Sequence, residues 1–168
     1  MNVKGKAGVL LAGIVAALAI TGVAAADAAR REGSEQKTID RGRYVIRIAG
    51  CNDCHTPGYA QSGGAVPEAQ WLTGDALGWS GPWGTTYAAN LRRVVADMSE
   101  EEWIRRARSA RYRPPMPWFN LRDMTDADLR AAYRYVRSLG PAGAPAPAYV
   151  PPGGQVSGPV VTFPAPPR

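Results

Sequence analysis

Cys51-Asn52-Asp53-Cys54-His55 is the segment around which the rest of this sequence is best understood. Two cysteines stand three positions apart, and a histidine directly follows the second one. Thiols at this spacing can form thioether bonds with both vinyl groups of one porphyrin, and the adjacent imidazole can then reach the iron from the same side. Cys-x-x-Cys-His is the attachment pattern of haem c. The segment therefore predicts a haem bonded to Cys51 and Cys54, with His55 as an iron ligand.

Other interpretations of the two cysteines explain the sequence less well. A structural zinc site needs four Cys or His ligands, and this chain has two cysteines and one histidine. A thioredoxin-like Cys-x-x-Cys follows a strand in an α/β pattern, whereas a helix is predicted before this motif. A disulfide between Cys51 and Cys54 would leave the neighbouring His55 without a role.

The single histidine excludes bis-histidine ligation and a second haem, so the sixth iron ligand is methionine, another weak donor, water or nothing. Met98 and Met124 precede predicted helix starts, where packing is the favoured role. Met116 instead lies in the segment 113–118, where three prolines prevent a helix and hold the chain extended. We favour Met116 as the distal ligand; the alternative is a loop residue packed under Trp118.

Three helices are predicted, over about Ile39–Ala49, Ser99–Arg108 and Thr125–Leu139. Thr38 can cap the first helix, and Gly50 ends it immediately before the motif. Ser99 and Glu102 form a capping box at the start of the second helix. Gly140, followed by proline, ends the third.

The long segment 56–90 is rich in glycine, proline, tryptophan and serine and has no clear hydrophobic period. A structureless loop of this length is uncommon in a compact domain. A bound haem gives such a loop a surface on which to pack. No convincing strand is found, and the expected fold class is all-α.

Four parts are expected along the chain. Residues 1–26 resemble an export signal, with lysines, an apolar stretch and small residues before Asp27, although an uncleaved membrane anchor is the alternative. Residues 27–37 are a polar linker, and residues 38–140 are the haem domain. Residues 141–168 hold nine of the fifteen prolines and form an extended tail on the surface or a tether. Export places the domain in the periplasm of a bacterium.

The formal charge of +6 is too small to indicate a nucleic-acid partner. One basic cluster has two open interpretations, and its members are Arg105, Arg106, Arg108, Arg111 and Arg113. It is either a solvated helix end or a surface that neutralises haem propionates or docks an acidic partner. The five tryptophans are expected in the haem pocket and core. Trp83, together with Tyr87, is the candidate hydrogen-bond donor to a propionate.

These features together resemble class I c-type cytochromes, and more narrowly the small haem domains related to cytochrome subunits of bacterial periplasmic dehydrogenases. The resemblance covers Thr38–Leu139 and rests on four segments: Cys51–His55, Gly81–Tyr87 before Asn90-Leu91, Ser99–Arg108 and Met116–Trp118. It implies a class I cytochrome c fold, with three main helices around one covalent haem and long irregular loops. It also implies Cys51 and Cys54 as thioether residues, His55 as the proximal ligand and Met116 as the distal ligand.

The same resemblance implies that the first and last helices cross at Gly42 and Tyr133. The proline-rich tail is a departure from the family pattern. Its one apolar patch, Val160–Phe163, could anchor it to the body.

The function that this resemblance implies is one-electron transfer, from a periplasmic dehydrogenase or to a respiratory oxidase or reductase. The sequence contains no second histidine and no other nucleophile paired with a base, so no enzyme activity is expected. A five-coordinate gas-binding or sensor haem protein is the alternative. Such proteins place Cys-x-x-Cys-His near the end of a four-helix bundle, and its early position here disfavours them. A membrane is expected as a partner only if the leader is not cleaved.

Overall fold

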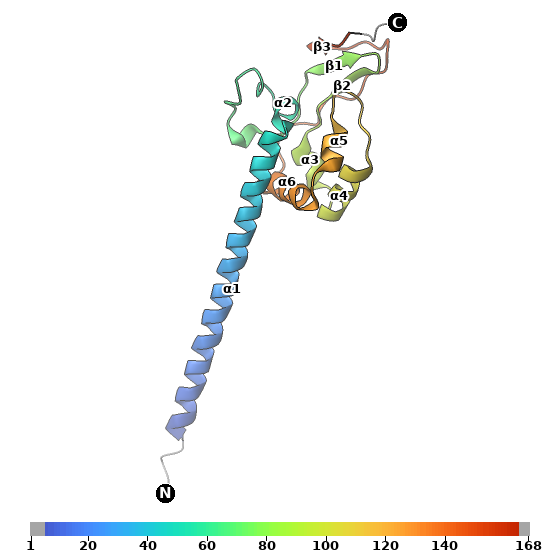
Figure 1. Cartoon of the computed structure of the whole chain (residues 1–168). Helices are drawn as coiled ribbons and strands as arrows, with labels where there is room; N and C mark the ends of the chain where they lie inside the picture. The colour runs from blue at the N-terminus through green and yellow to red at the C-terminus, as the bar shows by residue number, and fades with distance from the viewer. Residues whose placement is uncertain (1–5, 165–168) are drawn as a thin grey trace. The chain divides into compact units, whose positions relative to one another are not determined.

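The computed structural model describes the backbone of residues 6–164 and the side chains of residues 24–164. It divides between Lys37 and Thr38 into two compact units. The second unit contains the end of helix α1 (Lys6–Ile48) and every other element, and Figure 1 labels the α-helices and the strands. These are α2 (Cys51–His55), η1 (Glu68–Gln70), β1 (Gly78–Gly81), β2 (Gly84–Tyr87), α3 (Leu91–Ala96), α4 (Glu100–Ser109), α5 (Trp118–Asp123), α6 (Asp126–Ser138) and β3 (Val160–Thr162).

The helix expected to begin at Ile39 instead continues from the first unit, so Thr38 caps no helix start. The polar segment 27–37 is helical because it consists mostly of Ala, Arg, Glu, Gln and Lys, which are strong helix formers, and contains no proline. The side chains of residues 1–23 lie outside the described part of the structure, so the leader stays a prediction. Within the part that is described, no helix is long and apolar enough to cross a membrane.

Helices α1 and α6 touch at Gly42, which is buried. A Cβ atom at this position would overlap the carbonyl oxygen of Ala131 and lie 2.6 Å from Cβ of Tyr135. The prediction of Gly42 was therefore correct, but its partner is Tyr135 and not Tyr133. Ala131 and Tyr135 lie one turn apart on the same face of α6. The Tyr133 hydroxyl instead donates to the Met98 carbonyl, 2.8 Å away.

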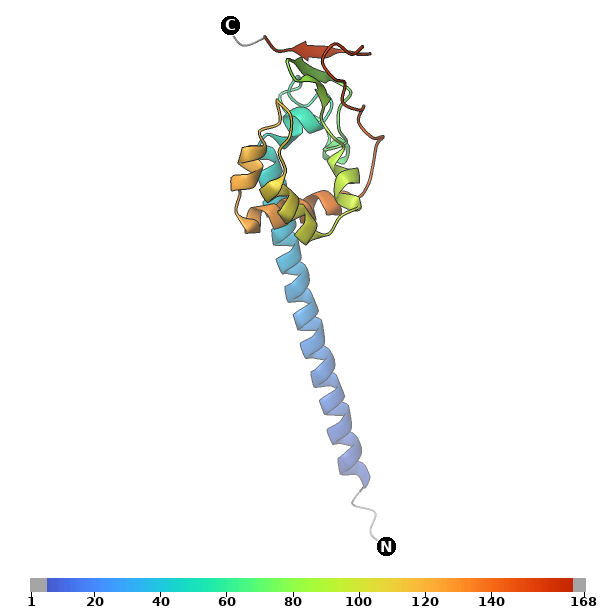
Figure 2. The same cartoon turned by 90° about the vertical axis from the view of Figure 1, so that its right-hand side faces the viewer.

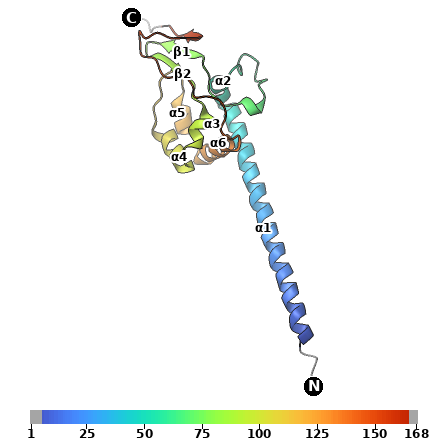
Figure 3. The same cartoon turned by 180° about the vertical axis from the view of Figure 1, so that it is seen from behind.

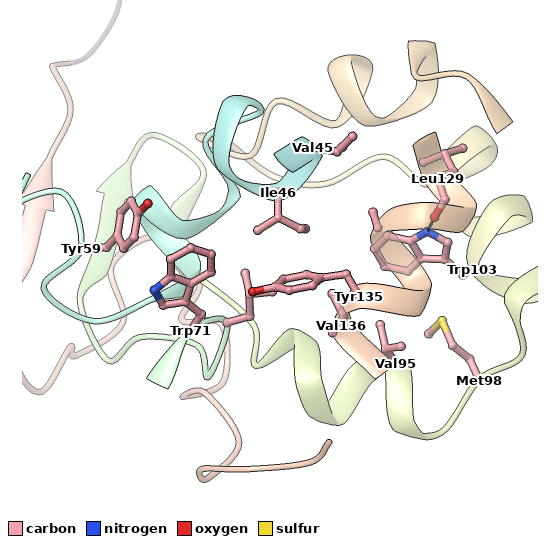
Figure 4. Close-up of a cluster of buried hydrophobic side chains, with 13 residues drawn as sticks. Val45, Ile46, Tyr59, Trp71, Val95, Met98, Trp103, Leu129, Tyr135 and Val136 are labelled. Atoms are coloured by element: carbon pink, nitrogen blue, oxygen red, sulfur yellow. Dashed lines mark hydrogen bonds between the residues drawn. The ribbon is translucent and has the colours of Figure 1, made fainter. Parts of the chain in front are cut away.

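The core lies between α6 and the elements around it, as Figure 4 shows. It is a cluster of buried hydrophobic side chains that includes Val45 and Ile46 of α1, Trp103 of α4 and Leu129 of α6. The Trp103 indole donates to the Leu129 carbonyl at 3.0 Å. Met98 is 9% exposed and belongs to the cluster, which confirms its packing role. Further members are Tyr59, Trp71, Leu72, Val95, Ala107, Ala132, Tyr135 and Val136.

Side-chain caps begin the last two main helices, and the predicted Ser99 cap is confirmed by its bond from the Glu102 amide. The Ser99 hydroxyl accepts a hydrogen bond from the Glu102 amide at 3.2 Å and begins α4. The Thr125 hydroxyl does the same for the Asp128 amide at 3.1 Å and begins α6. The short helices α3 and α5 were not predicted.

The expectation of no strands was wrong. Strands β1 and β2 form an antiparallel hairpin, and β3 from the tail pairs with β1 in parallel, giving the order β2-β1-β3. Each strand has only three or four residues, which is too short for a visible period-2 pattern. The tail runs from the end of α6 to this hairpin, as Figure 3 shows. Phe163 packs there against Trp79 and Trp83, with ring centroids 6.1 and 5.4 Å apart, so the predicted apolar anchor is confirmed.

Candidate haem-binding site

One turn of helix, α2, brings Cys51, Cys54 and His55 together. Gly50, with φ 69°, adopts the left-handed conformation that ends α1 and redirects the chain into α2. Both cysteines are free and partly buried. Burial raises the pKa of the Cys51 thiol to about 11 and also raises that of Cys54, so both are neutral thiols at pH 7.

His55 is buried, and its Nδ1 lies 2.7 Å from the carbonyl oxygen of Ala89. A carbonyl oxygen can only accept, so Nδ1 carries the proton and Nε2 keeps its lone pair. Burial lowers the pKa of His55, while the bond to Ala89 partly opposes that shift. The imidazole is therefore neutral and oriented, which is the state of a metal-binding histidine.

The back of α2 is held by a buried hydrogen-bond chain. The Thr56 hydroxyl donates to Asn52 Oδ1 at 2.8 Å and accepts from the Leu72 amide at 2.8 Å. The Gly74 amide donates to the His55 carbonyl at 2.9 Å. These bonds fix the turn of helix that carries the histidine. Sequence reasoning missed Asn52 and Thr56 because polar side chains beside the motif give no pattern of their own.

Met116 is partly exposed and lies in the segment between α4 and α5. Figure 2 shows this segment rising toward the β1–β2 hairpin. The Thr86 hydroxyl of β2 donates to the Pro114 carbonyl at 2.8 Å and ties the segment to the hairpin. At its other end the Trp118 amide donates to the Met116 carbonyl at 2.9 Å. The methionine is thus presented from a segment that is tied to the hairpin just before it and turns into α5 just after it.

The tryptophan indoles differ in whether their N–H groups are already used. Trp83 Nε1 donates to the Trp79 carbonyl at 3.3 Å, so this indole already has a partner, and its role as a propionate donor stays a prediction. Trp79 Nε1 is buried and has no partner among the described residues. A buried donor left unpaired costs about 1–3 kcal/mol. A carboxylate such as a haem propionate would satisfy Trp79, and in this respect the site fits a haem.

The basic cluster divides into one structural arginine and four exposed ones. Arg108 donates to the Arg122 carbonyl, and a second bond of 2.5 Å joins it to Asp126 Oδ1. These two bonds link α4 to α5 and α6. Within the described residues, four members form no salt bridge: Arg105, Arg106, Arg111 and Arg113. Two of these arginines, Arg111 and Arg113, lie in the Met116 segment, which is residues 110–117 between α4 and α5, and the other two lie on α4.

A family model described as cytochrome c matches residues 39–140, which is more than half of the chain. The chain belongs to the cytochrome c family. Cys51, Cys54 and His55 of this cytochrome fit the family's attachment motif, which implies haem c as the cofactor. The helix-rich second unit agrees with a class I cytochrome c fold, and the small sheet is an addition. The family assignment supports electron transfer as the function.

The fructose dehydrogenase cytochrome subunit of Gluconobacter japonicus is 28% identical to this cytochrome over 125 residues. That alignment covers 68% of the chain but 24% of the relative, so the chain spans about a quarter of the relative's length. The similarity supports the expected likeness to dehydrogenase cytochrome domains. No solved structure matches the chain.

Proposed function

We propose that this cytochrome carries single electrons on one haem, bonded through Cys51 and Cys54 and ligated by His55 and Met116. The observation that carries the proposal is the geometry of α2. Two free thiols share one helical turn with a neutral histidine whose Nδ1 is bonded to Ala89. Only Nε2 of His55 remains for iron.

When bound, haem c supplies a one-electron couple at its iron, and the surrounding chain sets the potential. The protein keeps His55 in one tautomer through Ala89 and excludes water by burying it. Thioether sulfur favours ferrous iron, so ligation by Met116 would raise the potential. No bond-making step is proposed.

The proposal selects Met116 because the other two described methionines have packing roles. Met98 is buried in the core, and Met124 is partly buried against it. Met116 belongs to no helix and is held beside the hairpin by the bond from Thr86 to Pro114. A stiff segment of this kind can present a thioether with little loss of conformational entropy.

The proposed partner is another redox protein, and a periplasmic dehydrogenase is favoured by the similarity to a dehydrogenase cytochrome subunit. The exposed arginines around the Met116 segment suit a partner with an acidic surface. This role requires export, which the N-terminal leader would provide.

The mass of the purified holoprotein tests the attachment. We expect the mass of the chain without its leader plus one haem, and Cys51→Ala and Cys54→Ala should each remove one thioether bond. A holoprotein that keeps Met1 would contradict the cleaved leader. A chain expressed with a haem-attachment system that gains no haem mass would contradict the proposed function.

A further inference from the structure

The tail, residues 141–164, lies beyond the matched cytochrome c domain, yet it is fastened to the hairpin near the Met116 segment. Val150 and Thr85 exchange two backbone hydrogen bonds of 2.8 and 3.0 Å. The approach is so close that a Cβ atom on Gly84 would overlap the Val150 carbonyl oxygen. The Tyr149 hydroxyl donates to the Trp83 carbonyl at 2.7 Å. Tyr149 is thus fixed by its hydroxyl and by its chain neighbour.

The ring of Tyr149 contacts Arg113, a residue of the Met116 segment. The guanidinium carbon of Arg113 lies 3.8 Å from the centroid of this ring, a close cation–π contact. Arg113 is exposed and forms no salt bridge within the described residues, and its guanidinium instead contacts the Tyr149 ring. Arg113 stands three positions before Met116.

A second contact holds the neighbouring residue of the same segment. The Thr86 hydroxyl donates to the Pro114 carbonyl at 2.8 Å, and Thr86 follows Thr85, which pairs with the tail. Strand β2 is therefore bonded through one residue to the tail and through the next to the Met116 segment. Proline has no amide hydrogen to donate, which leaves the Pro114 carbonyl and the Arg113 side chain to fasten this end of the segment.

We propose that the tail is a strap that holds the Met116 segment in place, with Tyr149 as its positioning residue. The proposal rests on the proposed function, because it matters only if Met116 ligates iron. The strap reduces the freedom of Arg113 and Pro114, and the prolines transmit that restraint to Met116. The thioether is then kept at the iron more of the time than in a cytochrome without the strap.

The test compares Tyr149→Ala with Tyr44→Ala. Tyr44 is another tyrosine near an arginine, with Arg41 5.2 Å from its ring centroid, but it is exposed and lies on α1, whereas Tyr149 is half-buried. In the reduced holoprotein, carbon monoxide binds only when the sulfur leaves the iron. Tyr149→Ala should increase the rate of carbon monoxide binding about two- to fivefold, the factor that corresponds to a surface cation–π contact. Tyr44→Ala should leave the rate unchanged.

Arg113→Gln removes the same contact from the other side, and we expect it to reproduce the effect of Tyr149→Ala. It also keeps the proposal testable if the tail variant fails to fold. Wild-type rates in both Tyr149→Ala and Arg113→Gln would overturn the strap, provided that the wild type shows the weak far-red absorption band of ferric iron bonded to thioether sulfur. Absence of that band from the wild type would overturn the ligation by Met116, and the strap with it.

Discussion

At the scale of single residues, the hydrogen bonds that a side chain already makes determine what it can still bind. Trp79 and Trp83 are close neighbours in the hairpin, and both carry an indole N–H. Trp83 has used its N–H on the Trp79 carbonyl, while that of Trp79 is buried and has no partner among the described residues. The two tryptophans therefore have different expected roles toward a haem propionate.

Trp79→Phe should lower the midpoint potential of the holoprotein. Loss of the indole donor leaves the negative charge of a propionate less neutralised, and uncompensated negative charge near iron favours the ferric state. Trp83→Phe is the matched control and should change the potential less. A redox titration of the two variants measures the difference, and equal shifts would contradict a specific role for Trp79.

The motif residues could be predicted from sequence because Cys51, Cys54 and His55 are adjacent in the chain and their chemistry requires that spacing. The free N–H of Trp79 could not be predicted, because nothing in the sequence shows which of the two indoles already has a hydrogen-bond partner. The bond from His55 to Ala89 was likewise invisible, since it joins residues from distant segments.

At the scale of helices, the contact between α1 and α6 depends on the absence of a side chain at Gly42. Ala131 and Tyr135 occupy the space that a Cβ atom would need. The backbones approach closely enough for glycine alone to fit without a shift. The contact holds the end of α1 against α6, and α2 with the haem-attachment motif begins three residues after α1 ends.

Gly42→Ala should destabilise the protein by about 1–3 kcal/mol, the usual cost of overpacking a core. Gly33→Ala changes the same helix at an exposed position, where alanine should be neutral or stabilise by about 0.5–1 kcal/mol. Urea unfolding of both variants, followed by circular dichroism, measures the two free energies of unfolding. A Gly42→Ala protein as stable as the wild type would contradict the backbone contact.

The sequence predicted α4 and α6 well because Ser99 and Thr125 are local start signals that act within one turn. It placed the start of α1 wrongly, because Thr38 has the same capping chemistry but stands inside a run of helix formers. The sheet was missed because β3 comes from the tail, and pairing between distant segments leaves no local pattern.

At the scale of the whole molecule, docking of a partner depends on the charges and apolar groups that are exposed near Met116 in the sequence. The exposed arginines around the Met116 segment lack carboxylate partners in the described part of the chain. Tyr112 and Phe119, 39% and 48% exposed, add apolar surface to the same region of the sequence. A positive surface with exposed aromatic residues is suited to brief docking of an acidic protein.

Arg106→Glu should slow the oxidation of the reduced protein by an anionic iron complex such as ferricyanide. Attraction between exposed charges is screened over about 10 Å at 0.1 M salt, so the wild-type rate should also fall as salt rises. Arg47→Glu makes the same charge change on α1 and serves as the control. Stopped-flow rates that depend neither on salt nor on Arg106 would show that this arginine is only a solvated residue.

The proposed electron carrier and the proposed strap both depend on Met116 as the distal ligand. Met116→Ala leaves Cys51, Cys54 and His55 untouched, so the haem should stay attached while the iron loses its sulfur ligand. Met98→Ala is the control: it should cost about 2–5 kcal/mol of stability, because Met98 is buried, and keep the ligand.

The oxidised absorption spectrum of Met116→Ala is the most direct measurement. We expect the weak far-red band of iron–thioether coordination in the wild type and in Met98→Ala, and we expect it to disappear in Met116→Ala. A Met116→Ala spectrum that keeps this band would contradict the assignment and transfer the role of ligand to another residue.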